Sequence, residues 1–281
     1  MAIVYLNGEY LPSEKAMVSV EDRGFLFADG IYEVVRYYGG RPFQFDAHFK
    51  RLEHSAEGAQ LPLAPAVAGL RQIIERLLAD NNLHDTNVYI ECTRGVARPR
   101  THAFPAQPNP SLLVMPLPIH ALPANALTQG VKAITVPDVR WARCDIKSIM
   151  LLPNVMAKTE ARGRGAFEAI MVRDGIVTEG SSTNIFAVLE DTLVTHPLDH
   201  HILGGITRQV TLALAAGLEL KVRESGFTLE QMYGAREVFL TSTTSEVLPI
   251  TQVDDRTIHH GAPGPVTLRL YEAFGKAVGE K

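Results

Sequence analysis

The sequence has only two cysteines and no long apolar run. Cys92 and Cys144 are too few for a disulfide framework, and no CxxC spacing offers a zinc site. Nowhere do about 18 uninterrupted apolar residues occur, and MAIVYLNGEYLPSEK, at the start, lacks a basic region before an apolar segment. We therefore expect neither export nor membrane insertion, and a reducing cytoplasm is the expected location.

An excess of positive charge is also missing. Lys and Arg number 27 against 31 Asp and Glu, which gives a formal net charge of −4. Binding to nucleic acid or to an anionic membrane would need Lys and Arg clustered on a basic domain. The expected partners are therefore a small molecule or another protein chain.

The sequence does contain enough apolar side chain for two domains. Of 281 residues, 46% are hydrophobic and 21% are charged, as in ordinary globular proteins. One domain usually holds about 100–150 residues. The stretch PLPIHALPANALTQG is rich in proline and small residues, which favours a linker. We predict an N-terminal α/β domain at 1–118, an interdomain linker at 119–130 and a C-terminal domain at 131–281.

Hydrophobic periodicity predicts a mixed α/β (α+β) fold in both domains. Apolar residues spaced by three and four predict helices, and β-branched or alternating stretches predict strands. The expected helices are 46–59, 65–82, 154–165, 207–218, 228–234 and 265–278. The expected strands include a hairpin at 3–11, a strand with a Gly-Gly turn at 31–43, and 87–95, 111–118, 131–136, 167–172, 184–190 and 237–243.

One lysine stands beside an apolar run. In WARCDIKSIMLLPNV (141–155), Lys147 precedes four apolar residues at 149–152, so the run is predicted to be buried. Desolvation disfavours an ammonium, and the neutral amine becomes available as a nucleophile or base, as Schiff-base chemistry requires. A salt bridge to Asp145 is the structural alternative.

A carboxylate among hydroxyls forms a second candidate. TEGSSTN (178–184) places Glu179 beside a glycine and three hydroxyl residues, between two predicted strands. Turns are often built from these residue types. A carboxylate held in this way would also suit the cationic nitrogen of a heterocycle.

Two stretches could bind an anion. In LGGITRQVTLAL (203–214), two glycines lead into a helix, so the N–H groups of Ile206 and Thr207 would be unpaired at its N-terminus. LTSTTSE (240–246) ends a strand with hydroxyls and is a weaker phosphate candidate. Arg51, on the helix from Asp46, could offer a two-pronged donor to phosphate. An ordinary turn and a solvated helical arginine are the alternatives.

A basic loop follows the strand at 87–95. RGVARPRTHAFP (94–105) holds three arginines and a histidine. Arginine forms paired hydrogen bonds to carboxylates, so the loop could trap a substrate carboxylate. A solvated loop is the alternative.

Together these features supply a Schiff-base amine, a ring-nitrogen partner, a phosphate cup and a carboxylate clamp, which a pyridoxal phosphate enzyme acting on amino acids needs. RCDIKSIMLL, VTEGSSTNIF, GITR and TSTTSE, in this order, resemble the class IV (fold type IV) pyridoxal phosphate enzymes. The similarity runs from EDRGFLFADGIYEVVR to TSTTSE, most of the chain. The resemblance implies a two-domain fold with a smaller N-terminal domain and a C-terminal domain that binds pyridoxal 5'-phosphate.

The resemblance also implies roles for single residues at the cofactor. Lys147 matches the catalytic lysine that forms the Schiff base and moves the proton at the substrate Cα. Glu179 matches the carboxylate that pairs with the pyridine nitrogen and keeps it protonated. Leu203 matches the apolar residue against the ring. The phosphate cup would comprise Arg51, Ile206, Thr207 and Thr243.

Within the family, RGVARPRTHAFP and Tyr32 are most similar to the D-amino acid aminotransferases. Tyr32, Arg100 and His102 match the group that binds the substrate carboxylate. In those enzymes the other subunit donates the loop, so the resemblance implies a homodimer. The D-specific pattern usually has three residues between RG and this arginine, whereas VARP gives four. Either the loop carries a one-residue bulge, or Arg98 takes part of the role.

The expected activity is ping-pong transfer of the amino group of a D-amino acid, such as D-alanine, to 2-oxoglutarate or pyruvate. A branched-chain L-amino acid aminotransferase and an aminodeoxychorismate lyase are the alternatives within the family. A non-catalytic phosphate-ligand binder is the alternative outside enzymes. No metal is expected, because His200–His201 and His259–His260 are adjacent pairs and lack the i, i+4 spacing of a helical metal site.

Overall fold

The computed structural model describes residues 2–64 and 66–279, and the chain divides into two compact units. Unit 1 holds the residues up to Ile119 together with Ile146–Met150, and unit 2 holds His120–Asp145 and the residues from Leu151 onward. The segment that carries Lys147 thus belongs to unit 1, although it falls within the predicted C-terminal domain 131–281. The predicted linker 119–130 contains a short helix, α4 (Ala126–Gln129).

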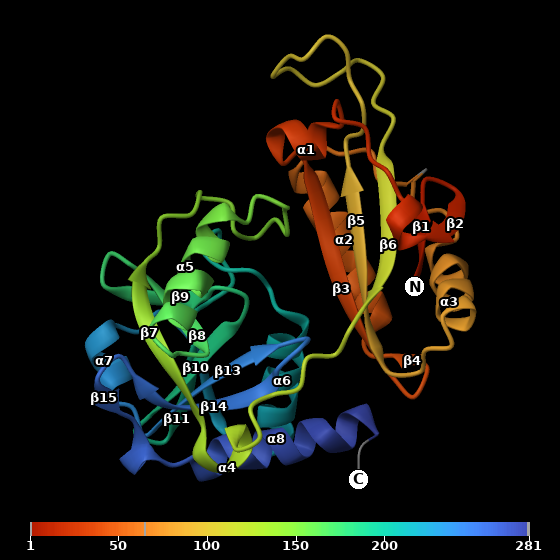
Figure 1. The fold of residues 1–281 in the computed structure, drawn as a ribbon. Helices are drawn as coiled ribbons and strands as arrows, with labels where there is room; N and C mark the ends of the chain where they lie inside the picture. Colours follow the sequence, from red (N-terminus) through yellow and green to blue (C-terminus); the bar gives the residue numbers. More distant parts are fainter. Residues whose placement is uncertain (1, 65, 280–281) are drawn as a thin grey trace. The chain divides into compact units, whose positions relative to one another are not determined.

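Unit 1 is a six-stranded antiparallel sheet with helices packed against it (Figure 1). The predicted hairpin at 3–11 is confirmed, and its turn residues Asn7 and Gly8 both have positive φ (49° and 100°), as the tight turn requires. In sheet order the strands are β2 (Glu9–Pro12), β1 (Ile3–Leu6), β6 (Ser111–Leu117), β5 (Thr86–Thr93), β3 (Gly30–Tyr38) and β4 (Arg41–Pro42).

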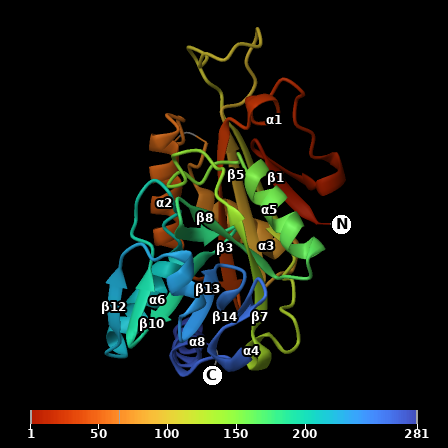
Figure 2. The same cartoon turned by 90° about the vertical axis from the view of Figure 1, so that its left-hand side faces the viewer.

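Two amphipathic helices supply the core of unit 1. α2 (Phe45–Gly58) packs on β3 and buries Leu52, and α3 (Leu70–Asp80) buries Ile74 and Leu77 against the sheet (Figure 2). The helix predicted at 65–82 begins later, at Leu70, because Gly69 before it is left-handed (φ 72°); residue 65 lies outside the described residues. A short helix, α1 (Arg23–Phe27), precedes β3, and a 3-10 turn, η1, spans Ser13–Lys15.

Unit 2 is built on a nine-stranded mixed sheet. The β11–β12, β14–β7 and β7–β8 pairs are parallel, and the other pairs are antiparallel. Along the sheet the strands are β12 (Lys221–Glu224), β11 (Thr192–Thr195), β10 (Asn184–Leu189), β13 (Glu237–Ser242), β14 (Glu246–Val253), β7 (Val131–Pro137), β8 (Glu168–Arg173) and β9 (Ile176–Gly180), with β15 (Arg256–Thr257) beside β14.

Helices cover this sheet at three places. α5 packs on β7 and β8, α6 and α8 pack on β13 and β14, and α7 contacts β9 and β10. Their bounds are α5 (Leu152–Gly163), α6 (Ile206–Gly217), α7 (Leu229–Tyr233) and α8 (Pro265–Val278), with a 3-10 turn, η2, at His259–Gly261. The four helices predicted in this half of the chain are therefore confirmed. Among the described residues, no helix has the length and apolar character that crossing a membrane requires.

Candidate active site

In unit 1, the backbone of Lys147 is fixed between β3 and α2. Its carbonyl accepts from the Tyr32 N–H at 3.0 Å, and its own N–H donates to Ser55 Oγ at 3.0 Å. Ser148 adds an isolated antiparallel bridge to Ile31. The Lys147 ammonium lies 4.2 Å from the centroid of the Tyr32 ring, within the range of a cation–π contact. The structure thus brings together Lys147 and Tyr32, two of the predicted site residues.

A buried ion pair on the same two elements holds Arg51. Its Nε and Nη2 donate to the Glu33 carboxylate at 2.9 and 2.6 Å, and His48 Nδ1 lies 3.1 Å from Glu33 Oε1. Burial would raise the pKa of Glu33, but the Arg51 guanidinium and His48 outweigh it and hold that pKa well below its ordinary range. Glu33 therefore stays ionised and sets the direction of the guanidinium.

In unit 2, the Glu179 carboxylate on β9 has three donors. Arg140 Nη1 donates to Oε1, and Asn184 Nδ2 and the Leu203 N–H each donate to Oε2 at 3.1 Å. An ionised carboxylate has about four acceptor positions, so one is left for a further N–H donor. Burial raises the pKa of Glu179, and the Arg140 guanidinium offsets part of that rise. The open acceptor position of this carboxylate fits the N–H of a protonated ring nitrogen.

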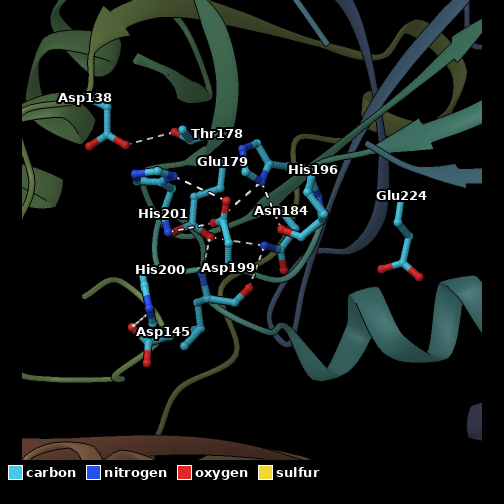
Figure 3. Close-up of polar contacts among 12 residues, drawn as sticks. Asp138, Asp145, Thr178, Glu179, Asn184, His196, Asp199, His200, His201 and Glu224 are labelled. Carbon is cyan, nitrogen blue, oxygen red and sulfur yellow. Dashed lines mark hydrogen bonds and ion pairs between the residues drawn. The ribbon is translucent and has the colours of Figure 1, made fainter. Parts of the chain in front are cut away.

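Arg140 in turn belongs to a row of alternating charges. It binds Asp138 through Nε (2.9 Å) and Nη2 (2.8 Å), and Arg173 and the Thr178 hydroxyl also contact Asp138, at 3.2 and 2.9 Å. Burial would raise the pKa of Asp138, but the hydrogen bonds and charge of Arg140 lower it to about 2. Figure 3 shows the Thr178–Asp138 bond beside Glu179. The row fixes the guanidinium that faces the Glu179 carboxylate.

Asn184 ties the Glu179 carboxylate to the start of α6. Its Nδ2 donates to both Glu179 and the Leu203 carbonyl, at 3.1 and 2.9 Å. Gly205, the residue before α6, lies so close that a Cβ there would be 3.2 Å from Asn184 Cγ and closer still to its Oδ1. Only glycine leaves Asn184 in this position.

The predicted phosphate residues lie at the start of α6 and at the β13–β14 turn. The first-turn amides of α6, among them those of Ile206 and Thr207, have no intrahelical carbonyl to bind, and Gly205 supplies no side-chain cap. Thr241, opposite Asn184 in the β10–β13 register, has a buried hydroxyl without a hydrogen-bond partner among the described residues. Thr243 follows in the turn. Free N–H and O–H donors in unit 2 thus suit the phosphate of a cofactor.

The structure separates the two candidate arginines of the basic loop. Arg98 is bound to Glu21, with Nε 2.6 Å from Oε2. The Arg100 guanidinium instead lies 4.4 Å from the centroid of the Phe27 ring, and His102 packs on the same ring edge to face, at 5.4 Å. The side chains of Arg98, Arg100 and His102 are all exposed.

This loop extends from the end of the unit 1 sheet (Figure 1). Among the described residues, no contact joins Arg98, Arg100 or His102 to Tyr32 or Lys147 of the same chain. Arg100 and His102 thus meet at Phe27, while no hydrogen bond, ion pair or ring contact among the described residues links them to Tyr32.

The prediction that the apolar run after Lys147 is buried is wrong for two of its four residues, Met150 and Leu152. Met150 is 45% exposed and Leu152 is 69% exposed. Leu152, Val155 and Met156 lie within two turns of α5 and leave an apolar surface open. Periodicity cannot distinguish a stripe that faces the core from one that is open in a single chain.

Sequence reasoning missed Asp138, Arg140 and the role of Asn184. Asn184 closes the TEGSSTN stretch, and the DVR triplet at 138–140 precedes Lys147 by only seven residues. An Asp-x-Arg pair shortly before the lysine was the available signal. Its partner, Glu179, lies 39 residues further on, a distance that no local pattern spans.

The family model described as amino-transferase class IV matches residues 30–253. A D-alanine aminotransferase of Staphylococcus epidermidis is 42% identical over 278 residues, which cover 99% of this chain and 98% of that protein. Similar solved structures include the branched-chain amino acid aminotransferase of Escherichia coli (29% identity, TM-score 0.89, 98% and 94% of the two chains) and the 4-amino-4-deoxychorismate lyase of Pseudomonas aeruginosa (26%, 0.83, 97% and 98%).

The match spans residues of both units, including Lys147 and Glu179. The mixed α/β fold and the family predicted from the motifs are both confirmed. The open acceptor position of Glu179, the uncapped start of α6 and the unpartnered Thr241 hydroxyl each fit one part of the cofactor of that family. The chain belongs to the class IV aminotransferases and is an enzyme that uses pyridoxal 5'-phosphate.

Proposed function

We propose that the protein transfers the amino group of a D-amino acid, such as D-alanine, to 2-oxoglutarate or pyruvate. The identity of 42% to a D-alanine aminotransferase over nearly the whole of both chains supports this activity. The similarity to branched-chain and aminodeoxychorismate enzymes, at 29% and 26% identity, supports the shared fold and only weakly the alternative activities.

The observation that carries the proposal is the state of Arg100. Among the described residues, its guanidinium has no acidic partner and is held over Phe27 beside His102, whereas Arg98 is neutralised by Glu21. A guanidinium without a protein carboxylate partner keeps its donor pairs for the paired hydrogen bonds of a substrate carboxylate. We therefore assign the substrate carboxylate to Arg100 and His102, and give Arg98 the structural role of securing the loop to Glu21.

The residues divide the chemistry among them. Pyridoxal 5'-phosphate, when bound, supplies an electron sink for the carbanion at the substrate Cα. Lys147 would provide the amine that holds the cofactor covalently, and as the free amine it would take the Cα proton and return a proton in the second half-reaction. The carbonyl and N–H of Lys147 are both bonded, so its side chain starts from a fixed point.

Charged and polar groups hold the rest of the cofactor. Glu179 would accept from the ring nitrogen and keep it protonated, and Arg140 holds the Glu179 carboxylate in place. Arg51, directed by Glu33, the amides of Ile206 and Thr207, and Thr243 would bind the phosphate. Leu203 would lie against the ring.

We further propose a homodimer in which each chain gives its basic loop to the site of its partner. Beside the start of that loop, unit 1 exposes a row of apolar side chains, which we name the apolar shoulder: Met17, Val18, Val20 and Phe25, at 79%, 52%, 73% and 73% exposure. Asp22, within this row, bridges to Val96 at the start of the loop. Large exposed apolar patches mark protein interfaces.

The two buried free thiols, Cys92 and Cys144, support a reducing cytoplasm as the location.

Substrate choice is tested with the purified enzyme. It is incubated separately with D-alanine, L-leucine and aminodeoxychorismate, and keto acid is measured with and without 2-oxoglutarate. We expect product from D-alanine only when the acceptor is present. Arg100→Ala should raise KM for D-alanine at least tenfold, and the matched Arg98→Ala should not. Preference for L-leucine, or acceptor-independent pyruvate release, would assign the chain to one of the other two activities.

Shared sites are tested by mixing two impaired variants at a D-alanine concentration below the wild-type KM. Under this condition Lys147→Ala should be inactive because it lacks the amine, and Arg100→Ala should keep at most about a tenth of wild-type activity because its KM is raised. If the loop crosses to the partner, random reassociation of equal amounts makes half of the dimers mixed, with one intact site in each, and restores about 25% of wild-type activity. Activity that stays at the level of the separate variants would show that each site uses its own chain's loop.

A further inference from the structure

Two histidines and an aspartate converge after β11, in the segment that leads to Leu203. The ligand atoms of His196, Asp199 and His201 all lie within 4.8 Å of one another. His201 Nδ1 is 3.3 Å from Asp199 Oδ2, and His196 Nδ1 is 3.8 Å from Asp199 Oδ1. Figure 3 shows the aspartate with both imidazoles directed toward it. The cluster is not part of the transamination machinery described above.

The donor types select the metal. Two imidazoles and one carboxylate suit zinc and its neighbours among the divalent transition metals, whereas magnesium and calcium favour sets of oxygen ligands. Three protein ligands leave the fourth tetrahedral position to water. The helical spacing rule does not detect this group, because its members lie on a loop at intervals of three and two residues.

The separations are within reach of a tetrahedral site. Metal bonds of about 2.0–2.1 Å place neighbouring ligand atoms about 3.3 Å apart, so the widest pair must approach by about 1.5 Å. The His196 side chain is 7% exposed and therefore fixed, while Asp199 and His201 are 38% and 43% exposed and can turn. One fixed ligand and two adjustable ones can close on an ion without refolding of the loop.

One existing contact would have to change. His196 Nδ1 lies 2.9 Å from the Pro197 carbonyl oxygen. A metal bound at this nitrogen would take the place of that contact.

Neighbouring cations do not oppose a metal, because each is already paired. Arg208 donates to the His196 carbonyl at 2.8 Å and is bound by Glu224 at 2.7 Å. Arg140 donates to the His201 carbonyl at 3.0 Å and is bound by Asp138 and Glu179. The Asp199 carboxylate therefore remains the uncompensated charge of the cluster, which favours a cation.

We propose that His196, Asp199 and His201 bind one zinc-type divalent ion per chain. The ion would cross-link the loop at 196–201, in which the carbonyls of His196 and His201 accept hydrogen bonds from Arg208 and Arg140. Because Arg140 also donates to Glu179, the ion would stabilise the position of that carboxylate. The site is independent of the amino acid substrate, so it can stand even if the D-amino acid assignment fails.

The test uses tag-free holoenzyme stripped with a chelator and saturated with pyridoxal 5'-phosphate. Zinc chloride is titrated calorimetrically, and cobalt(II) is added to a second sample as a reporter of coordination. We expect one zinc per chain and intense visible d–d bands from a low-symmetry cobalt site. His201→Ala and Asp199→Asn should each raise the zinc Kd at least tenfold and abolish the bands.

The adjacent histidine is the matched control. His200 is 68% exposed and its Nδ1 lies 3.3 Å from Asp145, so His200→Ala keeps the cluster intact and should leave the Kd unchanged. Circular dichroism establishes that each variant is folded. Unchanged binding in His201→Ala, equal loss in His200→Ala, or no stoichiometric zinc in the wild type would each overturn the site.

Discussion

Replacing Asp138 with asparagine tests the charge row that supports Glu179. The pKa of Asp138 is lowered from its ordinary value of 3.8 to about 2 in the folded chain, and its side chain is fully buried. The uncharged asparagine resembles the protonated acid in shape. The difference in pKa corresponds to about 2.4 kcal/mol, since one pKa unit is about 1.4 kcal/mol. Asp138→Asn should therefore lower the free energy of unfolding by about 2.4 kcal/mol at pH 7.

The lowered pKa of Asp138 determines whether its contribution to stability rises or falls with pH. A carboxylate whose pKa is depressed on folding stabilises the protein above its unfolded pKa, and this stabilisation is lost as pH falls through the folded value. The difference between wild type and Asp138→Asn should thus narrow from about 2.4 kcal/mol at pH 7 to about 1.3 kcal/mol at pH 3. At pH 7 it corresponds to a fall in Tm of about 5–10 °C for a chain of this size.

Calorimetry of the holoenzyme at pH 7 and urea unfolding at pH 7 and pH 3 measure these quantities. Asp191→Asn is the matched control: Asp191 also forms an ion pair, with Lys221, but both side chains are more than half exposed, so Tm should change little. Equal stability of Asp138→Asn and wild type at pH 7, or a difference that is as large at pH 3, would refute the charge row as we describe it.

Two further substitutions test the supports of the cofactor residues. Gly205→Ala should weaken pyridoxal 5'-phosphate binding at least tenfold in a fluorescence titration, because its Cβ would displace Asn184; in the control Gly204→Ala the Cβ meets only Leu198, at 3.6 Å, and affinity should persist. Glu33→Gln should lower the free energy of unfolding by about 3–5 kcal/mol in urea, since it leaves the Arg51 charge buried without its partner. Glu53 lies on the exposed face of α2, the helix that carries Arg51, so Glu53→Gln should change the free energy of unfolding little. Equal effects of the two substitutions would contradict the assigned ion pair.

Periodicity was enough to predict α2, which carries Arg51, and β10, which carries Asn184. The helix from Asp46 was predicted because its apolar residues recur every three or four positions, and the strand at 184–190 because its residues are apolar and β-branched. Both signals are local, and both elements are confirmed as α2 and β10.

β14 was not predicted, although it lies in the middle of the sheet. It contains Pro249, and proline cannot donate to a sheet ladder, which argues against a central strand. The structure accommodates it because the pairing of β14 with β7 begins only at Ile250, so no hydrogen bond from residue 249 is needed on that side. Whether a strand can contain a proline at a given position depends on which strands pair with it. A local sequence pattern does not show which strands these are.

The site was predictable where the chemistry depends on single residue types, and less so where it depends on distant pairs. The roles of Lys147 and Glu179 followed from a family resemblance and stay proposals. The Glu179–Arg140 pair, by contrast, joins β9 to the loop after β7 through side chains, and only the folded chain brings the partners together. The cluster around Asp199 has the same origin, because a loop brings its members together without a helical repeat.

The five residues Ile146–Met150 belong to unit 1 although the chain on both sides of them belongs to unit 2. The polypeptide therefore passes from one unit to the other three times, and neither unit is a contiguous piece of the gene. During synthesis, β3 can obtain its bond to the Lys147 carbonyl only after the whole first half of the chain, which includes part of unit 2, has left the ribosome. A gene fragment ending at residue 119 would encode the six strands of the first sheet but not the lysine. The two units are thus expected to have been inherited together, since recombination at a single point between them separates the amine from the strand that anchors it.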